Sequence, residues 1–286
     1  MSQSTSISPS KIRRFLTKYY EAGEAAALTR IVCTEVMGQS QIDYFLGKDI
    51  ELSVKEEEKI SSILERLSHF EPIQHIQGFS LFCGRRFIVT PNVLIPRPET
   101  EELAQLVVST TMPGCSLLDI GTGSGCLAVT LALDIPNAKV YAWDISPEAL
   151  EIAQRNAEVL QAKVSFFQCD VLQYKPLASD RFDVIVSNPP YVLERERDAM
   201  EPNVLRWEPH LALFVPDNDP LLFYRRIGTL GREMLHPNGR LFFEINYSQG
   251  SSVKDLLMEQ GYAEVEVKQD FYGNDRFVIA INNPLR

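Results

Sequence analysis

The feature that most constrains the fold is the alternation of strand-like and helix-like segments after residue 98. Seven apolar segments have the length and composition of strands: 116–120, 139–144, 164–169, 183–187, 240–246, 263–267 and 277–281. Helical periodicity separates the first three at about 125–133 and 147–160. The alternation predicts an α/β fold with a doubly wound, mostly parallel sheet. The last two strands are expected to pair antiparallel, because no helix separates them.

The chain before this alternation has a different pattern. Apolar residues repeat at intervals of three and four between residues 8 and 70, which predicts a small helical bundle. Ser53 and Glu56 have the spacing of a capping box, so one helix is expected at about 54–70, ending before Pro72.

A hairpin and a connector are expected between the two patterns. Apolar and polar residues alternate at 79–89 around Cys83 and Gly84, and residues 90–98 contain three prolines. We therefore expect a helical N-terminal domain over 1–75, a hairpin and linker over 76–97, and a catalytic domain over 98–286.

Composition and charge narrow the class of protein. Hydrophobic residues make up 45% of the chain and charged residues 23%, as in ordinary globular proteins. Because the sequence has no signal-like or membrane-spanning apolar run, we expect a cytoplasmic protein without a membrane partner. Residues 1–90 carry 11 basic and 11 acidic side chains, whereas the rest carries 17 and 27, which disfavours nucleic acid as a partner. The cysteines and histidines lack metal-ligand spacing, so no metal is expected.

A glycine-rich turn is expected where the strand at 116–120 meets its helix. This glycine turn contains Asp119, Gly121, Thr122, Gly123, Ser124 and Gly125. Glycine is favoured there because a side chain would keep a ligand away from the backbone. The third glycine comes one position too early for a dinucleotide fingerprint, since that position holds Cys126. The spacing resembles instead the first motif of S-adenosylmethionine methyltransferases, which implies that these residues bind S-adenosylmethionine.

Acidic residues follow the next two predicted strands. Asp144 ends the strand at 139–144, so we expect it at the same sheet edge, where its carboxylate can accept both ribose hydroxyls. The alternative is that Asp144 caps the following helix, but Ser146 can serve as that N-cap. By resemblance to the same superfamily, Asp170 and Val171 would contact the adenine.

A rigid polar segment follows the apolar strand at 183–187. It consists of Asn188, Pro189, Pro190 and Tyr191, and we call it the Asn-Pro-Pro-Tyr motif. Two prolines remove two N–H donors, so the stiff loop presents carbonyl acceptors beside the acceptor of Asn188. These acceptors suit a planar NH2 group, and Tyr191 can stack on its plane. The motif therefore predicts a methyltransferase that positions an amino or amide nitrogen.

The chain resembles the peptide-chain release factor glutamine N5-methyltransferases over nearly its whole length. The likeness rests on residues 95–101, on the glycine turn and the Asn-Pro-Pro-Tyr motif, and on Glu208-Pro209 with Ala212-Leu213. It implies a seven-stranded class I methyltransferase fold and methylation of the glutamine in the Gly-Gly-Gln loop of bacterial class I release factors. It also implies that the N-terminal domain and hairpin bind that protein substrate.

The same resemblance singles out residues at both ends of the catalytic domain. Arg97 and Glu99 fall in the linker beside the cofactor and are carried as candidate binding residues. Asp270, Gly273 and Arg276 fit the closing pattern of the family, but their spacing suggests no mechanistic role.

Three other functions stay open at this point. Adenine also carries an amino group on a planar ring, so the chain could methylate nucleic acid by flipping the base. Only 95 residues follow Tyr191, and the catalytic half is acidic, which disfavours a DNA clamp. Glutamine methylation of a ribosomal protein and non-catalytic cofactor binding are the remaining alternatives. We expect a monomer that acts on release factors.

Overall fold

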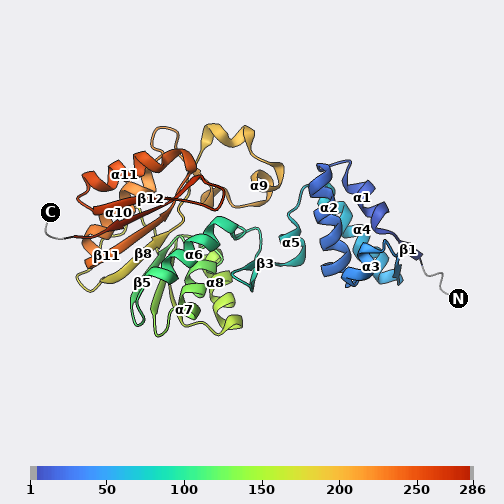
Figure 1. The fold of residues 1–286 in the computed structure, drawn as a ribbon, viewed down its shortest axis with the longest axis horizontal. Coiled ribbons are helices and arrows are strands. Elements are labelled where there is room, and N and C mark those ends of the chain that lie inside the picture. Colours follow the sequence, from blue (N-terminus) through green and yellow to red (C-terminus); the bar gives the residue numbers. More distant parts are fainter. Residues whose placement is uncertain (1–4, 284–286) are drawn as a thin grey trace. The chain divides into compact units, whose positions relative to one another are not determined.

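The computed structural model describes residues 5–283 (Figure 1). Contacts between residues divide the chain into two compact units. The first holds the residues up to Gly78 together with Glu201–Trp207, and the second holds Phe79–Met200 and the residues from Glu208 onward. The expected domain limits after residues 75 and 97 stay a prediction. No helix within residues 5–283 is long and apolar enough to cross a membrane.

The first unit is the helical bundle that its periodicity predicts. Its helices are α1 (Pro9–Leu16), α2 (Ala22–Ile31), α3 (Gln41–Phe45), α4 (Val54–Ser68) and α5 (Ile73–Gln77), with a π-helical turn, η1 (Val32–Val36), after α2. The capping box at the start of α4 is confirmed, because the Ser53 N–H donates to Glu56 and the Glu56 N–H donates to Ser53. A short antiparallel pair, β1 (Thr5–Ile7) with β2 (Ile50–Leu52), was not predicted, since three-residue strands show no measurable alternation.

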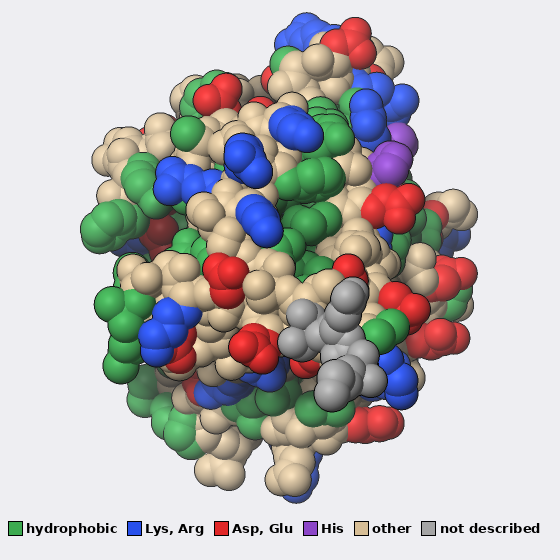
Figure 2. Space-filling view, turned by 90° about the vertical axis from the view of Figure 1, so that its right-hand side faces the viewer, with side chains coloured by type: hydrophobic (Ala, Val, Ile, Leu, Met, Phe, Trp, Pro, Cys, Tyr) green, Lys and Arg blue, Asp and Glu red, His purple; other side chains and the backbone are tan. Residues whose placement is uncertain are grey.

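The surface of the first unit combines basic and apolar side chains. Exposed basic residues lie on α1 and directly after it: Lys11, Arg13, Arg14 and Lys18. On α3 and directly after it, Ile42, Phe45 and Leu46 are 72%, 78% and 67% exposed. Figure 2 shows one face of the molecule, on which Lys and Arg side chains lie around hydrophobic ones.

The second unit is built on a seven-stranded sheet, as expected. The strands in spatial order are β12 (Ala263–Gln269), β13 (Asp275–Ile281), β11 (Leu235–Glu244), β8 (Phe182–Ser187), β5 (Ser116–Ile120), β6 (Lys139–Asp144) and β7 (Val164–Gln168). All neighbours are parallel except that β13 runs antiparallel to both β11 and β12. The predicted antiparallel pair at the end of the chain is therefore confirmed.

Helices cover both faces of this sheet and bury a core on each (Figure 1). One core packs α6 (Pro98–Thr110), α7 (Cys126–Asp134) and α8 (Pro147–Leu160) against the sheet, and the other packs α10 (Leu222–Met234) and α11 (Gly250–Glu259). Along β8, Val184 belongs to the first core and Ile185 to the second. The sequence of a strand that is buried on both faces is a nearly continuous apolar run, which is why β8 could be predicted.

A hairpin of β3 (Phe79–Phe82) and β4 (Arg85–Ile88) also belongs to the second unit. Its two turn residues, Cys83 and Gly84, both have positive φ angles, of 47° and 73°, as a two-residue hairpin loop requires. Phe82 and Phe87 are fully buried and meet edge to face, with ring centroids 5.8 Å apart. The predicted hairpin is thus confirmed.

The segment after the Asn-Pro-Pro-Tyr motif is irregular and was not predicted. It contains β9 (Val192–Leu193) paired with β10 (Phe214–Val215), two 3-10 turns, η2 (Glu194–Ala199) and η3 (His210–Ala212), and the short helix α9 (Pro202–Trp207). A third 3-10 turn, η4 (Tyr247–Gln249), follows β11. Within the first unit, the Trp207 indole N–H donates to the carbonyl of His69, which explains why α9 groups with the helical bundle.

The sheet reverses its direction of growth between β5 and β8. After β5 the chain adds β6 and β7 on one side. It then adds β8, β11, β12 and β13 on the other side, where β13 lies between β11 and β12. In open α/β sheets such a switch point leaves a crevice at the carboxyl ends of the strands, where ligands bind. The glycine turn follows β5 and the Asn-Pro-Pro-Tyr motif follows β8, so both lie at the switch point, where the topology predicts such a crevice.

Candidate active site

The Asn-Pro-Pro-Tyr motif lies directly beside the glycine turn. The Ser187 hydroxyl donates to the carbonyl of Ile120 at 2.7 Å and so ties the end of β8 to the end of β5. A Cβ on Gly121 would lie 4.0 Å from the carbonyl oxygen of Asn188. The two segments that the sequence singled out are therefore brought together, although 67 positions separate Ser187 from Ile120.

The backbone of the glycine turn requires its glycines. Gly121, Gly123 and Gly125 have φ angles of 78°, 54° and 78°. A Cβ on Gly125 would lie 2.9 Å from the Cβ of Ala153, so this glycine allows α7 and α8 to pack closely. A Cβ on Gly123 would meet no atom within 4 Å, so this part of the turn faces open space. The turn therefore leaves room for a ligand against bare backbone.

Asp119 stabilises the glycine turn by a hydrogen bond within it. Its side chain is buried, and it accepts a hydrogen bond from the Thr122 hydroxyl at 2.7 Å. Burial raises the pKa of Asp119 to about 7, although the hydrogen bond from Thr122 opposes that rise. Thr122 and Ser124 are also buried, whereas Gly121 is exposed. Cofactor contacts of Asp119, Thr122 and Ser124 stay a prediction.

Asp144 connects the glycine turn to β6. Its Oδ2 accepts from the Gly123 N–H at 2.8 Å, and its Oδ1 accepts from the Ser146 N–H at 2.9 Å. Ser146 caps α8 by accepting from the Ala149 N–H, so Asp144 does not serve as that cap. Burial raises the pKa of Asp144. An ionised carboxylate has about four acceptor positions, so Asp144 can also accept from a ribose hydroxyl.

Asp170 and Val171 follow β7 at the same edge of the sheet. The Asp170 carboxylate accepts from the Leu172 N–H at 2.9 Å and from the Gln173 side chain at 2.8 Å. The Arg226 guanidinium donates to the carbonyl of Val171 at 2.9 Å. Both residues are half-buried, and their contact with adenine stays a prediction.

The proline-rich linker is fixed by Glu208. This buried carboxylate accepts from the Arg97 guanidinium at 2.5 Å and from the Ile95 N–H at 3.1 Å. The resemblance singled out both Arg97 and Glu208, and the structure brings them together as an ion pair. Glu99 is half-buried at the start of α6. Cofactor contacts of Arg97 and Glu99 stay predictions.

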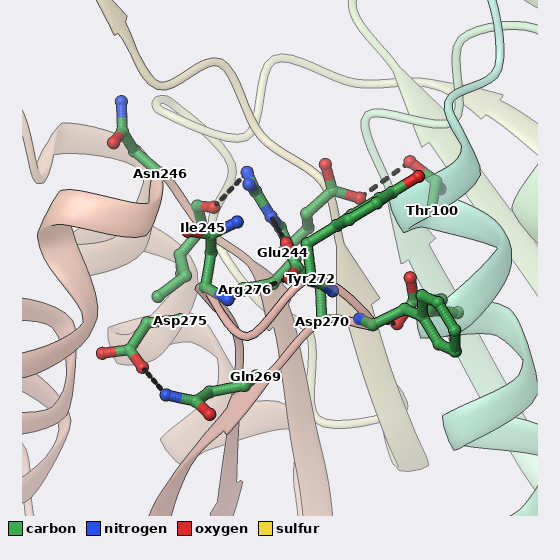
Figure 3. A network of polar contacts seen from close by, with 12 residues as sticks. Thr100, Glu244, Ile245, Asn246, Gln269, Asp270, Tyr272, Asp275 and Arg276 are labelled. Carbon is green, nitrogen blue, oxygen red and sulfur yellow. Dashed lines mark hydrogen bonds and ion pairs between the residues drawn. The ribbon is translucent and has the colours of Figure 1, made fainter.

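A chain of hydrogen bonds connects the Asn-Pro-Pro-Tyr motif to the sheet. The Asn188 amide donates from Nδ2 to the Thr100 hydroxyl at 3.1 Å, and Thr100 donates to Oε2 of Glu244 at 2.7 Å, as Figure 3 shows for the second bond. The Tyr191 hydroxyl makes a longer contact of 3.5 Å with Oε1 of the same carboxylate. Burial raises the pKa of Glu244 to about 7 and raises that of Tyr191 above its usual value.

Thr100 and Glu244 belong to the site but were not predicted from the sequence. The available signal was a single acid, Glu244, inside the apolar run 240–246, since carboxylates are rarely buried without a polar partner. The sequence does not show that its partner is Thr100, because 144 positions separate them.

Asp270 and Arg276 hold a turn between β12 and β13 next to Glu244 (Figure 3). Oδ1 of the buried Asp270 carboxylate accepts from the N–H groups of Tyr272 and Asn274, and Oδ2 accepts from the Arg276 guanidinium at 3.1 Å. Burial would raise the pKa of Asp270, but these hydrogen bonds lower it. The turn carries Phe271, which is 89% exposed, and its φ of 84° at Gly273 favours glycine. The closing pattern of the sequence therefore has a structural role.

Asn156 is a third residue that the sequence did not reveal. Its buried amide exchanges two hydrogen bonds with the backbone of Ile88, and it also donates to the carbonyl of Ser124 at 2.8 Å. One side chain on α8 thereby ties the β3–β4 hairpin to the glycine turn.

Comparisons with known proteins agree with this geometry. A family model described as a methyltransferase domain matches residues 112–274, and one described as the PrmC N-terminal domain matches residues 10–78. A release factor glutamine methyltransferase of Bacteroides thetaiotaomicron is 49% identical over 94% of this chain and 97% of its own length. The chain belongs to the release factor glutamine methyltransferase family.

Two further matches support this membership and the fold. A release factor glutamine methyltransferase of Flavobacterium psychrophilum is 40% identical over 92% of this chain and 94% of its own length. The crystal structure of a methyltransferase from Pyrococcus furiosus covers 78% of this chain and 99% of its own, with a TM-score of 0.54 and 20% identity, and shows the fold alone. The predicted family and the class I methyltransferase fold are therefore confirmed.

The chain is thus a methyltransferase, and its cofactor is S-adenosylmethionine. The crevice fits that group, because Gly123 leaves open space beside Asp144, whose carboxylate keeps acceptor positions free. Within residues 5–283 no three His, Cys, Asp or Glu side chains lie close enough to hold a metal ion.

Proposed function

We propose that this chain transfers a methyl group from S-adenosylmethionine to the side-chain amide nitrogen (N5) of the glutamine in the Gly-Gly-Gln motif of bacterial class I release factors. The observation that carries the proposal is the position of the Asn-Pro-Pro-Tyr motif. It lies at the switch point beside the glycine turn, in a chain whose relatives are release factor glutamine methyltransferases. A glutamine amide is planar and has two N–H donors, which suits the acceptors of this motif.

The residues of the motif position the amide. The nitrogen forms the new C–N bond as the methyl–sulfur bond breaks, the demethylated thioether is the leaving group, and the proton that the nitrogen loses passes to water. When bound, S-adenosylmethionine supplies a methyl group that is already electrophilic. Oδ1 of Asn188 would accept one N–H of the substrate, and the carbonyl of Pro189 or Pro190 would accept the other. The ring of Tyr191 would lie against the amide plane. Fixing the nitrogen in this way can lower the barrier by up to ~7 to 11 kcal/mol.

We further propose that the N-terminal domain, over 1–75, and the hairpin and linker, over 76–97, bind the release factor. The exposed basic side chains of α1 and the apolar side chains around α3 offer a surface of the kind that protein interfaces use. The acidic catalytic half supports a protein substrate over a nucleic acid. We propose that the chain acts as a monomer in the cytoplasm.

The direct test is methyl transfer in solution. The purified chain is mixed with tritiated S-adenosylmethionine and with a release factor or its variant with alanine in place of the glutamine of the Gly-Gly-Gln loop. We expect label on the release factor and none on the variant. Ribosomal protein and duplex DNA are tested in parallel, and label on either of them instead of the release factor would overturn the proposal.

A further inference from the structure

The orientation of the Asn188 amide is set by two buried groups, the Thr100 hydroxyl and the Glu244 carboxylate. Asn188 donates to Thr100, and Thr100 donates to Glu244, at 3.1 Å and 2.7 Å. Thr100 is 5% exposed and Glu244 is 1% exposed, so water does not replace these partners. The three residues come from the loop after β8, the first turn of α6 and the end of β11.

The number of protons available decides which group donates and which accepts in each of these hydrogen bonds. A threonine hydroxyl has one proton, and an ionised carboxylate only accepts. Thr100 therefore gives its proton to Glu244 and can only accept from Asn188. Its partner must then be the NH2 end of the amide, which leaves Oδ1 of Asn188 turned away from Thr100.

We propose that Thr100 and Glu244 are positioning residues that orient the Asn188 amide so that Oδ1, not Nδ2, faces the substrate NH2 group. This inference rests on the proposed function, because it assigns the atom that receives the glutamine amide. An Asn188 amide in the opposite orientation would present two donors to a group that is itself a donor. The misplaced amide would then repel the substrate nitrogen instead of holding it.

The same carboxylate also contacts the other end of the motif. Oε1 of Glu244 lies 3.5 Å from the Tyr191 hydroxyl, and a hydrogen bond from the Asn188 side chain lowers the pKa of Glu244, so one carboxylate interacts with both functional ends of the Asn-Pro-Pro-Tyr motif. The charged and titratable groups that act on Glu244 and Tyr191 come from four further places in the fold: Arg97 in the linker, Glu99 on α6, Tyr224 on α10 and Arg276 on β13. The Arg276 cation favours the ionised form of Glu244, and the Glu99 carboxylate opposes it.

Protonation of Glu244 would remove the constraint on which groups donate and which accept in these hydrogen bonds. A protonated carboxyl can donate to Thr100, whose hydroxyl is then free to donate to Oδ1 of Asn188. Because burial raises the pKa of Glu244 to about 7, this change falls near neutral pH. The productive orientation is present above that pKa and is lost as the pH falls through it.

An NMR titration tests the assignment of donors and acceptors among Asn188, Thr100 and Glu244, and it needs no substrate. The 13Cδ signal of Glu244 and the side-chain NH2 signals of Asn188 are followed with pH in the full chain. We expect both to change with one midpoint, and we expect Thr100→Val to reduce the response of Asn188 while Glu244 still titrates, because the Asn188 side chain also hydrogen-bonds to Glu244 and keeps part of its response. Asn188 signals that do not change with pH in the wild-type chain, or that change in Thr100→Val with the full wild-type amplitude, would overturn the inference.

A kinetic test measures the consequence for transfer. Thr100→Val should lower kcat for release factor methylation roughly 10- to 100-fold, with little change in KM for S-adenosylmethionine, and Thr100→Ser should restore most of it. Thr130→Val is the matched control, since the buried Thr130 hydroxyl has no hydrogen-bond partner within residues 5–283. An unchanged kcat in Thr100→Val would overturn the inference. A wild-type chain that leaves release factors unlabelled would overturn the proposed function instead, and the NMR titration would still decide the proton order.

Discussion

Asn188 and Asp144 have different proposed roles, the first in binding the substrate amide and the second in binding the cofactor, although both lie at one edge of the sheet. Asn188 has its NH2 end occupied by Thr100, whereas the Asp144 carboxylate accepts from the backbone at Gly123 and Ser146. The first arrangement leaves an acceptor for a substrate amide, and the second leaves acceptors for a diol. At the scale of single residues, substitution of Asn188 should therefore affect methyl transfer, whereas substitution of Asp144 should affect cofactor binding.

Asn188→Ala should reduce kcat at least about 100-fold with little effect on cofactor affinity, because it removes the substrate acceptor. Asp144→Ala should weaken binding of S-adenosylmethionine about 10-fold or more, because it removes a charged acceptor. Calorimetric titration with S-adenosylmethionine and methyl-transfer kinetics measure both effects. Asp255→Ala, at an exposed position on α11, is the control for Asp144→Ala. The reverse pattern in the two variants would contradict both roles.

The pH dependence of transfer should follow Glu244. In the wild-type chain kcat should fall as the pH falls through about 7, tending to about 10-fold per pH unit well below the pKa. Glu244→Gln should flatten this profile, because the amide keeps an acceptor for Thr100 but cannot ionise. Asp119→Asn is the control, since burial also raises the pKa of Asp119 to about 7, and its profile should keep the fall. A pH profile that survives in Glu244→Gln would exclude Glu244 as its source.

At the scale of elements, the glycine turn is shaped by the packing of α7 against α8. Gly125 and Gly114 both have a φ of 78°, but only Gly125 lies against a neighbouring helix, at Ala153. A side chain at either position is strained by the backbone, and a side chain at Gly125 also collides with Ala153.

Gly125→Ala should therefore lower the free energy of unfolding more than Gly114→Ala does. We expect a loss of about 1 kcal/mol for Gly114→Ala, from the backbone alone, and about 2 to 4 kcal/mol for Gly125→Ala, because overpacking adds to it. Urea unfolding measured on both variants gives the difference. Equal losses would show that the contact with Ala153 does not limit the packing of these helices.

At the scale of the whole molecule, the two units have different proposed roles. The crevice with its cofactor and amide acceptors is formed within the second unit, whereas the exposed apolar side chains around α3 belong to the first. Binding of the release factor and binding of S-adenosylmethionine should therefore respond to different surfaces.

Phe45→Ser should raise KM for the release factor about 5- to 10-fold, because an exposed aromatic side chain at an interface contributes about 1 kcal/mol or more. The affinity for S-adenosylmethionine should not change. Met112→Ser is the matched control, since Met112 in the second unit is also 78% exposed. If both variants have the wild-type KM, the surface around Phe45 is not part of the binding site.

Most regular elements of the sheet were predictable from local pattern. The predicted strands 116–120 and 139–144 and the predicted helix 147–160 coincide with β5, β6 and α8. β11 begins at Leu235 instead of residue 240, because its pairing with β8 shifts register between Leu235 and Arg240, and a pattern of period two does not cross such an irregularity. The short elements between residues 192 and 215 were not predicted, because they are too short to show a period.

The sequence by itself determined the doubly wound fold, the glycine turn, the Asn-Pro-Pro-Tyr motif and the family. Each of these depends on residues that are close in the chain, where spacing alone constrains backbone and chemistry. Only the tertiary structure decided which distant groups support these segments: Thr100 and Glu244 hold Asn188, Glu208 holds the linker, and Asn156 connects the hairpin to the glycine turn. The physical reason is that a buried polar group must find a partner wherever the fold places one, and that partner can lie more than a hundred residues away.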